Sequence, residues 1–433
     1  MKRASLWLIT LLAGAAFADP SVTVTSVSAS AKGAGFVDIA YETAGVEAGA
    51  ECSYELALTV GGVAAASFTD FAWCDLPIAN GSHTVTWNAK ADGVETPDLS
   101  TFSGAIAPVT ATKTDADYMI VDVSAGKVAA SYPIRYAKAG ANVTTAQFNK
   151  PEYKLHKIAF KRVKVGDFLE TTVGDQTYPY TFKMGVGTVA TGTAWHPVRL
   201  TKDYFLGIFE VTQQQYKDVT DANPSAYTSK ETALESIKAE ITDYTMHPVN
   251  KLVYDTLAGA DGLFGRLTAR AGVTIGAPTE AQWEFACRAG CESKYHWGAD
   301  IETAEGELVE DRYGWNNLNS SPNAGTGRTT HGVGELLPNA WGFYDMTGNC
   351  YEYCSDFHAD YKSKSTSAPE EDPTGAESGK RVIRGGAFAH KRTCMASGDR
   401  SNSQDGSTDG GGGYGGYWAA MLGVRLAMTV EAE

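Results

Sequence analysis

The stretch from Pro338 to Phe357, PNAWGFYDMTGNCYEYCSDF, constrains the fold of this chain more than any other. Turn-forming and aromatic residues alternate along it: Asn339, Trp341, Gly342, Phe343, Tyr344, Gly348, Asn349, Tyr351 and Tyr353. Glycine and asparagine adopt backbone conformations that helices and strands exclude, and aromatic rings supply large apolar surfaces to bury. We therefore expect a rigid loop with buried rings rather than a long helix or a regular ladder.

Two acidic residues, Asp345 and Glu352, bracket Gly348 and Asn349 in this stretch. Calcium binds oxygen ligands that are spaced along a bent backbone, so the spacing is compatible with a calcium site. The same two acids could instead be solvated or cap neighbouring amides. Spacing alone leaves both interpretations open.

Several short segments accompany this stretch in a fixed order. Upstream lie GIFEVTQQQY (207–216), HPVN (247–250) and APTEAQWEFACRAG (277–290), and downstream lie RVIRGGAF (381–388) and LGVRL (422–426). Together they resemble the signature of the formylglycine-generating enzyme family, also called the sulfatase-modifying-factor domain. The resemblance covers roughly Lys157 to Met428.

The resemblance implies an α+β fold of the C-type-lectin-like kind, rich in irregular structure and with bound calcium. The calcium ligands that it implies are Asp345, Gly348, Cys350 and Glu352, with Asn319 of the Asn-rich turn at 316–327 as a further candidate. It also implies a disulfide between Cys354 and Cys394, because relatives often carry a partner cysteine after RGG.

The chain departs from the family at the two cysteines that follow RGG in the enzymes, which hold copper and handle the substrate thiol. Ala387 stands in place of a serine, His390 in place of the first cysteine and Met395 in place of the second, with Cys394 one residue away. Paired thiolates select monovalent copper, and Cys394 with His390 does not restore such a pair. Cys394 and His390 are the catalytic candidates only if the chain is an oxidase, with copper as its cofactor.

Composition is that of a globular protein, with 43% hydrophobic and 20% charged residues and a length that allows two or three domains. The 36 Lys and Arg against 51 Asp and Glu leave a net charge of -15, and no dense basic stripe occurs. Nucleic acid and anionic membrane surfaces are therefore poor partners for this chain.

Residues 1–18 have the parts of a secretory signal: Lys2 and Arg3, an apolar run from Leu6 to Phe17, and a small-residue end at Ala18. The apolar run is too short to span a membrane, and no later segment is long enough. We predict export by a signal peptide to a periplasm or to the exterior.

Between residues 19 and 110, short alternating runs separated by glycine-rich breaks predict an all-β sandwich of the immunoglobulin or fibronectin type. Residues 111–156 form a second β-rich piece, which we interpret as a bridging segment. The sulfatase-modifying-factor-like domain then occupies residues 157–433. Two of its helices are predicted from capping boxes, one beginning after Thr212 with Gln215 and one after Thr279 with Gln282.

The seven cysteines suit an oxidising compartment, although their odd number leaves at least one free thiol. Cys52 and Cys74 lie apart from the others in the first domain, and we expect them to pair. Cys287 and Cys350 are interpreted as small buried apolar groups.

Ser401 to Trp418, SNSQDGSTDGGGGYGGYW, has the Ser, Asn, Gly and Tyr composition of adaptable binding loops, which a plain surface loop can share. We therefore expect an exported, calcium-stabilised module that binds a protein or glycan ligand, or a divergent enzyme without copper–dithiol chemistry. The alternative is an active oxidase that converts a cysteine of a partner sulfatase to formylglycine.

Overall fold

The computed structural model describes residues 20–46, 54–64, 79–90, 94–108, 111–138, 145–166, 170–173, 176–185, 195–228, 243–298, 309–321, 327–361, 369–402 and 419–430. The chain forms two compact units, Met1–Val109 and Thr110–Glu433. The predicted signal peptide, Cys52, Cys74 and most of the 401–418 loop lie outside the described residues. None of the helices in the described residues has the length and apolar character needed to cross a membrane.

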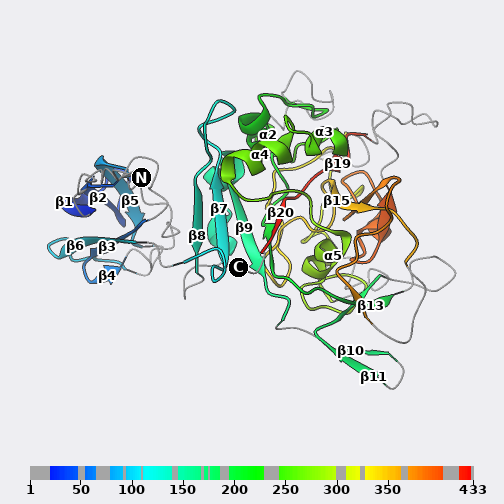
Figure 1. Cartoon of the computed structure of the whole chain (residues 1–433). Coiled ribbons are helices and arrows are strands. Elements are labelled where there is room, and N and C mark those ends of the chain that lie inside the picture. The colour runs from blue at the N-terminus through cyan, green and yellow to red at the C-terminus, as the bar shows by residue number, and fades with distance from the viewer. Residues whose placement is uncertain are drawn as a thin grey trace, which may run out of the picture. The chain divides into compact units, whose positions relative to one another are not determined.

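The described residues of the first unit form two three-stranded antiparallel sheets (Figure 1). One has the order β1-β2-β5 (Ser21–Ala29, Phe36–Ala44, Gly81–Asn88), and the other has the order β4-β3-β6 (Val63–Ala64, Tyr54–Val60, Phe102–Pro108). Alternate side chains of β2 and β3 and the fully buried Trp87 share one apolar core. The unit is therefore β-rich, as predicted, and its immunoglobulin or fibronectin type stays a prediction.

The second unit is built on a five-stranded antiparallel sheet with the order β20-β14-β9-β7-β8. These strands are Ala427–Thr429, Tyr204–Gly207, Lys157–Val163, Tyr118–Asp122 and Ile134–Ala137. Strands β7 and β8 come from residues 111–156, so this segment is not a separate bridging piece. It supplies one edge of the main sheet, because β7 pairs antiparallel with β9, and four of the five side chains of β7 are buried there.

Smaller elements complete the second unit. A four-stranded sheet has the order β18-β17-β15-β19 (Arg400–Asn402, Arg381–Arg384, Tyr351–Phe357, Leu422–Gly423). A three-stranded sheet has the order β12-β13-β16 (Phe182–Met184, His196–Arg199, Glu370–Glu371), and β10 (Glu170–Val173) pairs with β11 (Gln176–Pro179) in a hairpin. In the described residues, the helices are α1 (Pro151–Leu155), α2 (Gln213–Thr220), α3 (Tyr254–Ala258), α4 (Leu263–Ala271) and α5 (Glu280–Arg288), with 3-10 turns η3 (Thr145–Phe148) and η5 (Arg392–Met395).

Both predicted capping boxes are confirmed. Thr212 caps α2 and Thr279 caps α5. In each, the threonine hydroxyl accepts a hydrogen bond from the backbone amide of the third helical residue, a glutamine, and the side-chain oxygen of that glutamine accepts one from the backbone amide of the threonine. Helix α5 is buried along its whole length, so the cap fixes the start of a helix at the centre of the unit.

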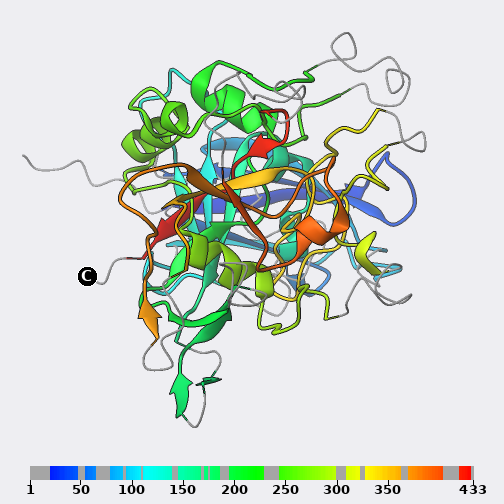
Figure 2. The same cartoon turned by 90° about the vertical axis from the view of Figure 1, so that its right-hand side faces the viewer.

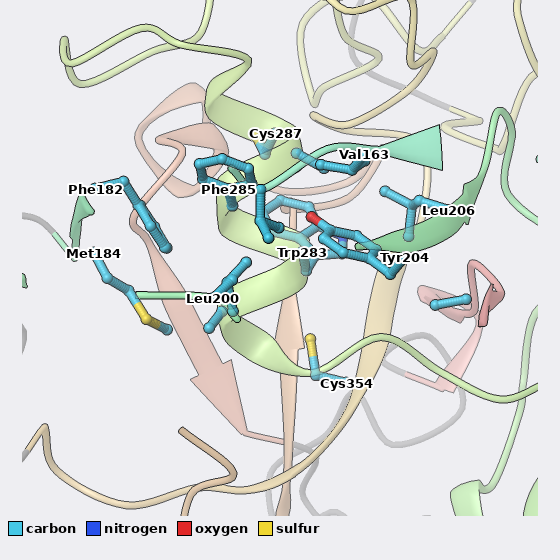
Figure 3. Packing of buried hydrophobic residues seen from close by; sticks show 14 of the residues in the cluster. Val163, Phe182, Met184, Leu200, Tyr204, Leu206, Trp283, Phe285, Cys287 and Cys354 are labelled. Carbon is cyan, nitrogen blue, oxygen red and sulfur yellow. The ribbon is translucent and has the colours of Figure 1, made fainter. Parts of the chain in front are cut away.

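The predicted rigid loop is also confirmed, since residues 338–350 contain no helix or strand. Asp345 and Asn349 have positive φ angles of 53° and 55°, which turn the chain between buried rings. Beside this loop, Trp283 and Phe285 of α5, Tyr204 of β14 and Cys354 of β15 pack into one apolar cluster (Figure 3). This cluster packs α5 against the loop and against strands β15 and β17, which carry the candidate site.

Candidate functional site

The segment that follows β17 carries the two predicted catalytic residues. Gly385 and Gly386 turn the chain at the end of β17 with φ angles of 95° and 75°. A Cβ atom at Gly386 would lie 2.9 Å from the carbonyl oxygen of Cys394, so glycine is needed where the returning chain packs. Residues 385–399, which we call the β17–β18 loop, therefore form a closed loop that presents His390 and Cys394.

Buried ion pairs fix both ends of the β17–β18 loop on helix α5. At its start, Arg384 pairs with Glu284 and, at 3.2 Å, with Glu280. At its end, Arg400 pairs with the same Glu280 at 2.5 Å. The Arg384 guanidinium also donates to the carbonyl oxygen of Ser397 at 2.9 Å. Because these charged groups are buried, the loss of one partner would leave an uncompensated charge.

His390 and Cys394 meet at the ring of Tyr351, the first residue of β15. The His390 and Tyr351 ring centroids are 5.1 Å apart, and the side chains of Tyr351 and Cys394 are hydrogen-bonded. Burial raises the pKa of the Cys394 thiol, and burial lowers the pKa of the His390 imidazole. At neutral pH the site therefore holds a neutral thiol and a neutral imidazole, not a thiolate–imidazolium pair.

The predicted Cys354–Cys394 disulfide is wrong in this structure, where both residues are free thiols. Tyr351 and Cys354 are three residues apart on β15, so their side chains point to opposite faces of the strand. Cys354 lies in the apolar cluster with Trp283 (Figure 3). Cys394 instead contacts Tyr351, whose side chain is on the other face. Cys287 and Cys350 are buried, as predicted.

Three carboxylates, those of Glu210, Asp345 and Glu352, are buried around the guanidinium of Arg425. Glu352 accepts hydrogen bonds from Arg425 Nη2 at 2.7 Å and from Trp283 Nε1 at 2.5 Å. Burial and the neighbouring acids raise the pKa of Glu210 well above its ordinary value, and burial raises the pKa of Asp345 to about 6. Three ionised acids beside one arginine would carry an excess of buried negative charge, which protonation of Glu210 or a further cation would relieve.

Of the predicted calcium ligands, Asp345 fits a cation best. Its Oδ2 accepts from the amide of Gly334 at 2.6 Å, and its Oδ1 is buried without a hydrogen-bond partner in the described part of the chain. Gly348 has no side chain, so it could bind a cation only through its backbone carbonyl oxygen. The thiol of Cys350 is a poor ligand because burial raises its pKa, which leaves only the backbone of that residue as well.

The other two predicted ligands are already engaged. Both oxygens of Glu352 are bound by Arg425 or Trp283, so this carboxylate is not free for a cation. The Asn319 side chain is engaged as well, since its Oδ1 accepts from the backbone amide of Asn316 at 2.7 Å and its Nδ2 donates to the Gly314 carbonyl oxygen at 3.0 Å. Its role as a calcium ligand stays a prediction. Across the described residues, no group of three or more His, Cys, Asp or Glu side chains is arranged to hold a metal.

Several residues that organise this region were not predicted, namely Glu210, Arg425 and the α5–loop set of Glu280, Glu284, Arg384 and Arg400. One signal was available, because Glu210 interrupts the apolar run Ile208, Phe209 and Val211. A charged residue in a buried run needs a partner. The partners of these charged residues could not be assigned from the sequence, because they are distant along the chain. Glu210 accepts from the backbone amide of Cys350, 140 residues further on, and Glu284 pairs with Arg384, 100 residues further on.

Comparison with known proteins identifies the second unit. Residues 160–415 match the family model FGE-sulfatase, described as a sulfatase-modifying factor enzyme 1-like domain. Among curated proteins, a formylglycine-generating enzyme of Thermomonospora curvata is 33% identical over 179 residues, which cover 40% of this chain and 54% of that protein. The chaperone protein LppX of Paenibacillus barcinonensis is 29% identical over 195 residues, covering 36% of this chain and 63% of LppX. The chain thus spans little more than half the length of these relatives.

Two solved structures are also similar. Treponema denticola variable protein 1 has a TM-score of 0.46 and 24% identity, covering 63% of this chain and 95% of that one. PvdO from Pseudomonas aeruginosa has a TM-score of 0.45 and 19% identity, covering 63% of this chain and 94% of that one.

Proposed function

The chain belongs to the family of sulfatase-modifying factor enzyme 1-like domains, and on that premise we propose that it is an exported binding protein rather than a copper oxidase. Its ligand, a protein or a glycan, is recognised on the β17–β18 loop and its surroundings. The observation that carries this proposal is the lone thiol of the loop, since Cys394 is free and is held by Tyr351.

The surroundings of the other described cysteines support the absence of a dithiol site. Cys287 contacts the Met346 carbonyl in the core, and Cys291 lies 3.0 Å from the Ser293 hydroxyl. Neither arrangement brings a second sulfur to Cys394 in the described part of the chain. A soft ligand pair for monovalent copper needs a second thiolate beside Cys394, and the contacts of Cys287 and Cys291 do not supply one.

The alternative function is an oxidase that converts a sulfatase cysteine to formylglycine, which is favoured by the similarity to formylglycine-generating enzymes. Such an activity would use Cys394 as its one thiol, with His390 in place of the first family cysteine. The raised pKa of Cys394 argues against it, because the thiol and not the reactive thiolate is present at neutral pH.

Incubation with a cysteine-containing sulfatase peptide tests the proposal. The peptide is followed by mass spectrometry with copper and oxygen present, and an active formylglycine-generating enzyme serves as positive control. We expect the peptide mass to stay unchanged with this protein. Loss of sulfur from the peptide, abolished by Cys394→Ser, would establish the oxidase instead.

Calcium binding is part of the proposal and is supported by the orphaned oxygen of Asp345 and the excess of buried acids around Arg425. The backbones of Gly348 and Cys350 are the further ligands available there. We expect a chelator to lower the melting temperature of the wild-type protein and to have no effect on Asp345→Ala. An equal response of both proteins to the chelator would remove calcium from this site.

A further inference from the structure

Helix α1 carries a lysine whose ammonium group lies over the ring of Phe209. Lys154 Nζ is 5.6 Å from the centroid of that ring, and the Lys154 carbonyl oxygen accepts a hydrogen bond from the Thr212 hydroxyl at 2.6 Å. Burial lowers the pKa of Lys154, and the negative charges of Asp345 and Glu335 act in the opposite direction. The ammonium group is therefore half-buried and interacts electrostatically with two acids.

The Phe209 ring also packs against the residues around the Asp345 carboxylate. It stacks on the ring of Tyr344 with centroids 5.1 Å apart, and Tyr344 directly precedes Asp345. A Cβ atom at Gly334 would lie 2.6 Å from the Phe209 ring, and the amide of Gly334 donates to Asp345 Oδ2 at 2.6 Å. One aromatic ring thus contacts both the ammonium group of Lys154 and the surroundings of the Asp345 carboxylate.

The segment of residues 327–345, which carries both acids, has no helix or strand of its own. It runs as an irregular trace, in yellow, in Figure 2. Contacts with the region of α1 hold it in place. The Asn149 side chain donates to the carbonyl oxygen of Gly334 at 2.8 Å, and the charge of Lys154 acts on Glu335. The charge of Lys154 is therefore part of the structure that surrounds Asp345.

Two positive charges act on Asp345, and they differ in how far they are already compensated. Arg425 donates to both oxygens of Glu352, at 2.7 Å from Nη2 and at 3.0 Å from Nε. Lys154 forms no direct ion pair with any residue that the structure describes. Its charge is therefore compensated only at a distance, by Asp345 and Glu335.

A cation that binds at Asp345 has to share this carboxylate with Lys154. Oδ1 of Asp345 is buried and has no hydrogen-bond partner in the described part of the chain. Two cations that face one carboxylate repel each other, and the repulsion is larger in a buried site because little water or salt screens it. Calcium at Asp345 would therefore bind against the charge of Lys154.

We propose that Lys154 regulates the cation site at Asp345: its ammonium group is the counter-charge of the site when no metal is bound, and it weakens the binding of calcium. This inference rests on the calcium binding that is part of the proposed function, and it adds the residue that sets the affinity. Calcium sites are tuned by the net charge of their surroundings, and weak sites occur in extracellular modules. A site weakened by Lys154 fills only where calcium is plentiful.

Isothermal titration calorimetry with calcium chloride on the full chain tests this proposal. Lys154→Met keeps a side chain that packs on Phe209 but removes the charge, so it should bind calcium at least about threefold more tightly than the wild type. Lys154→Arg keeps the charge and should keep the wild-type affinity. Lys157→Met is the matched control, because Lys157 Nζ lies 5.3 Å from the centroid of the Tyr153 ring, and it should leave the affinity unchanged. Adding Asp345→Ala to Lys154→Met should abolish the binding, which assigns it to this site.

Thermal melts separate this role from a merely structural one. In chelator, Lys154→Met should melt below the wild type, because Asp345 and Glu335 lose their counter-charge. With saturating calcium the difference should vanish or reverse, because the metal then supplies the positive charge. A merely structural role of Lys154 would lower the melting temperature by the same amount in both conditions, which would overturn the proposal.

The titration distinguishes failure of this proposal from failure of the calcium site. Equal calcium affinity of the wild type and Lys154→Met would overturn the role of Lys154 and leave the calcium site intact. Calcium binding detected only in Lys154→Met would support the role. Absence of binding in both proteins would overturn the calcium site and this inference together, and the sulfatase-peptide assay would still test the binding function separately.

Discussion

Replacing Arg384 by methionine tests how the β17–β18 loop is held. The guanidinium is fully buried, pairs with Glu284 and Glu280, and donates to the carbonyl oxygen of Ser397. Methionine keeps most of the volume but leaves Glu284 with Arg288 alone and Glu280 with Arg400 alone. Removing one partner of a buried pair costs about 3–5 kcal/mol, which for a unit of this size lowers the melting temperature by about 10 °C.

Chemical denaturation followed by circular dichroism measures this loss, and a double-mutant cycle isolates the pair. Glu284→Gln removes the charge that Arg384→Met leaves behind, so the double variant should lose less stability than the sum of the two single variants. Arg199→Met is the matched control, because the Arg199–Glu371 pair is exposed and should contribute less than about 1 kcal/mol. A loss below about 1 kcal/mol for Arg384→Met, or full additivity in the cycle, would refute the reasoning.

Three further predictions concern pH, capping and thiols. Burial raises the pKa of Asp356 to about 7 from 3.8 in the unfolded chain, so stability should fall as pH rises from about 4 to 7, and Asp356→Asn should flatten this slope in unfolding titrations; an unchanged slope would contradict the assignment. Thr279→Ala should cost about 1 kcal/mol by removing the cap of α5, whereas Thr279→Ser should keep most of it, which thermal melts can compare. Denatured, non-reduced protein should show five reactive thiols by mass if Cys52 and Cys74 pair, and a count of three would restore the Cys354–Cys394 bridge.

The sequence predicted the parts of the fold that local chemistry determines. The capping boxes at Thr212 and Thr279 placed α2 and α5, and the alternation of glycine, asparagine and aromatic residues predicted the irregular loop before β15. Helices α3 and α4 were not predicted, because neither has a side-chain cap and Gly262 separates two short apolar groups.

Contacts between distant segments could not be read from the sequence in the same way. The family resemblance implied a Cys354–Cys394 bridge, but strand alternation directs Cys354 into the core and away from Cys394. Glu352 was expected to bind calcium, yet Arg425, far along the chain, engages its carboxylate. The site therefore depended on pairings that only the folded chain reveals.

A copper(I) titration against a competing chelator tests most directly whether the site holds a single thiol. We expect no tight stoichiometric binding by the wild-type protein, and one equivalent bound by the variant that carries both His390→Cys and Met395→Cys, which restores the family pattern. One equivalent bound tightly by the wild-type protein and lost in Cys394→Ser would contradict the account.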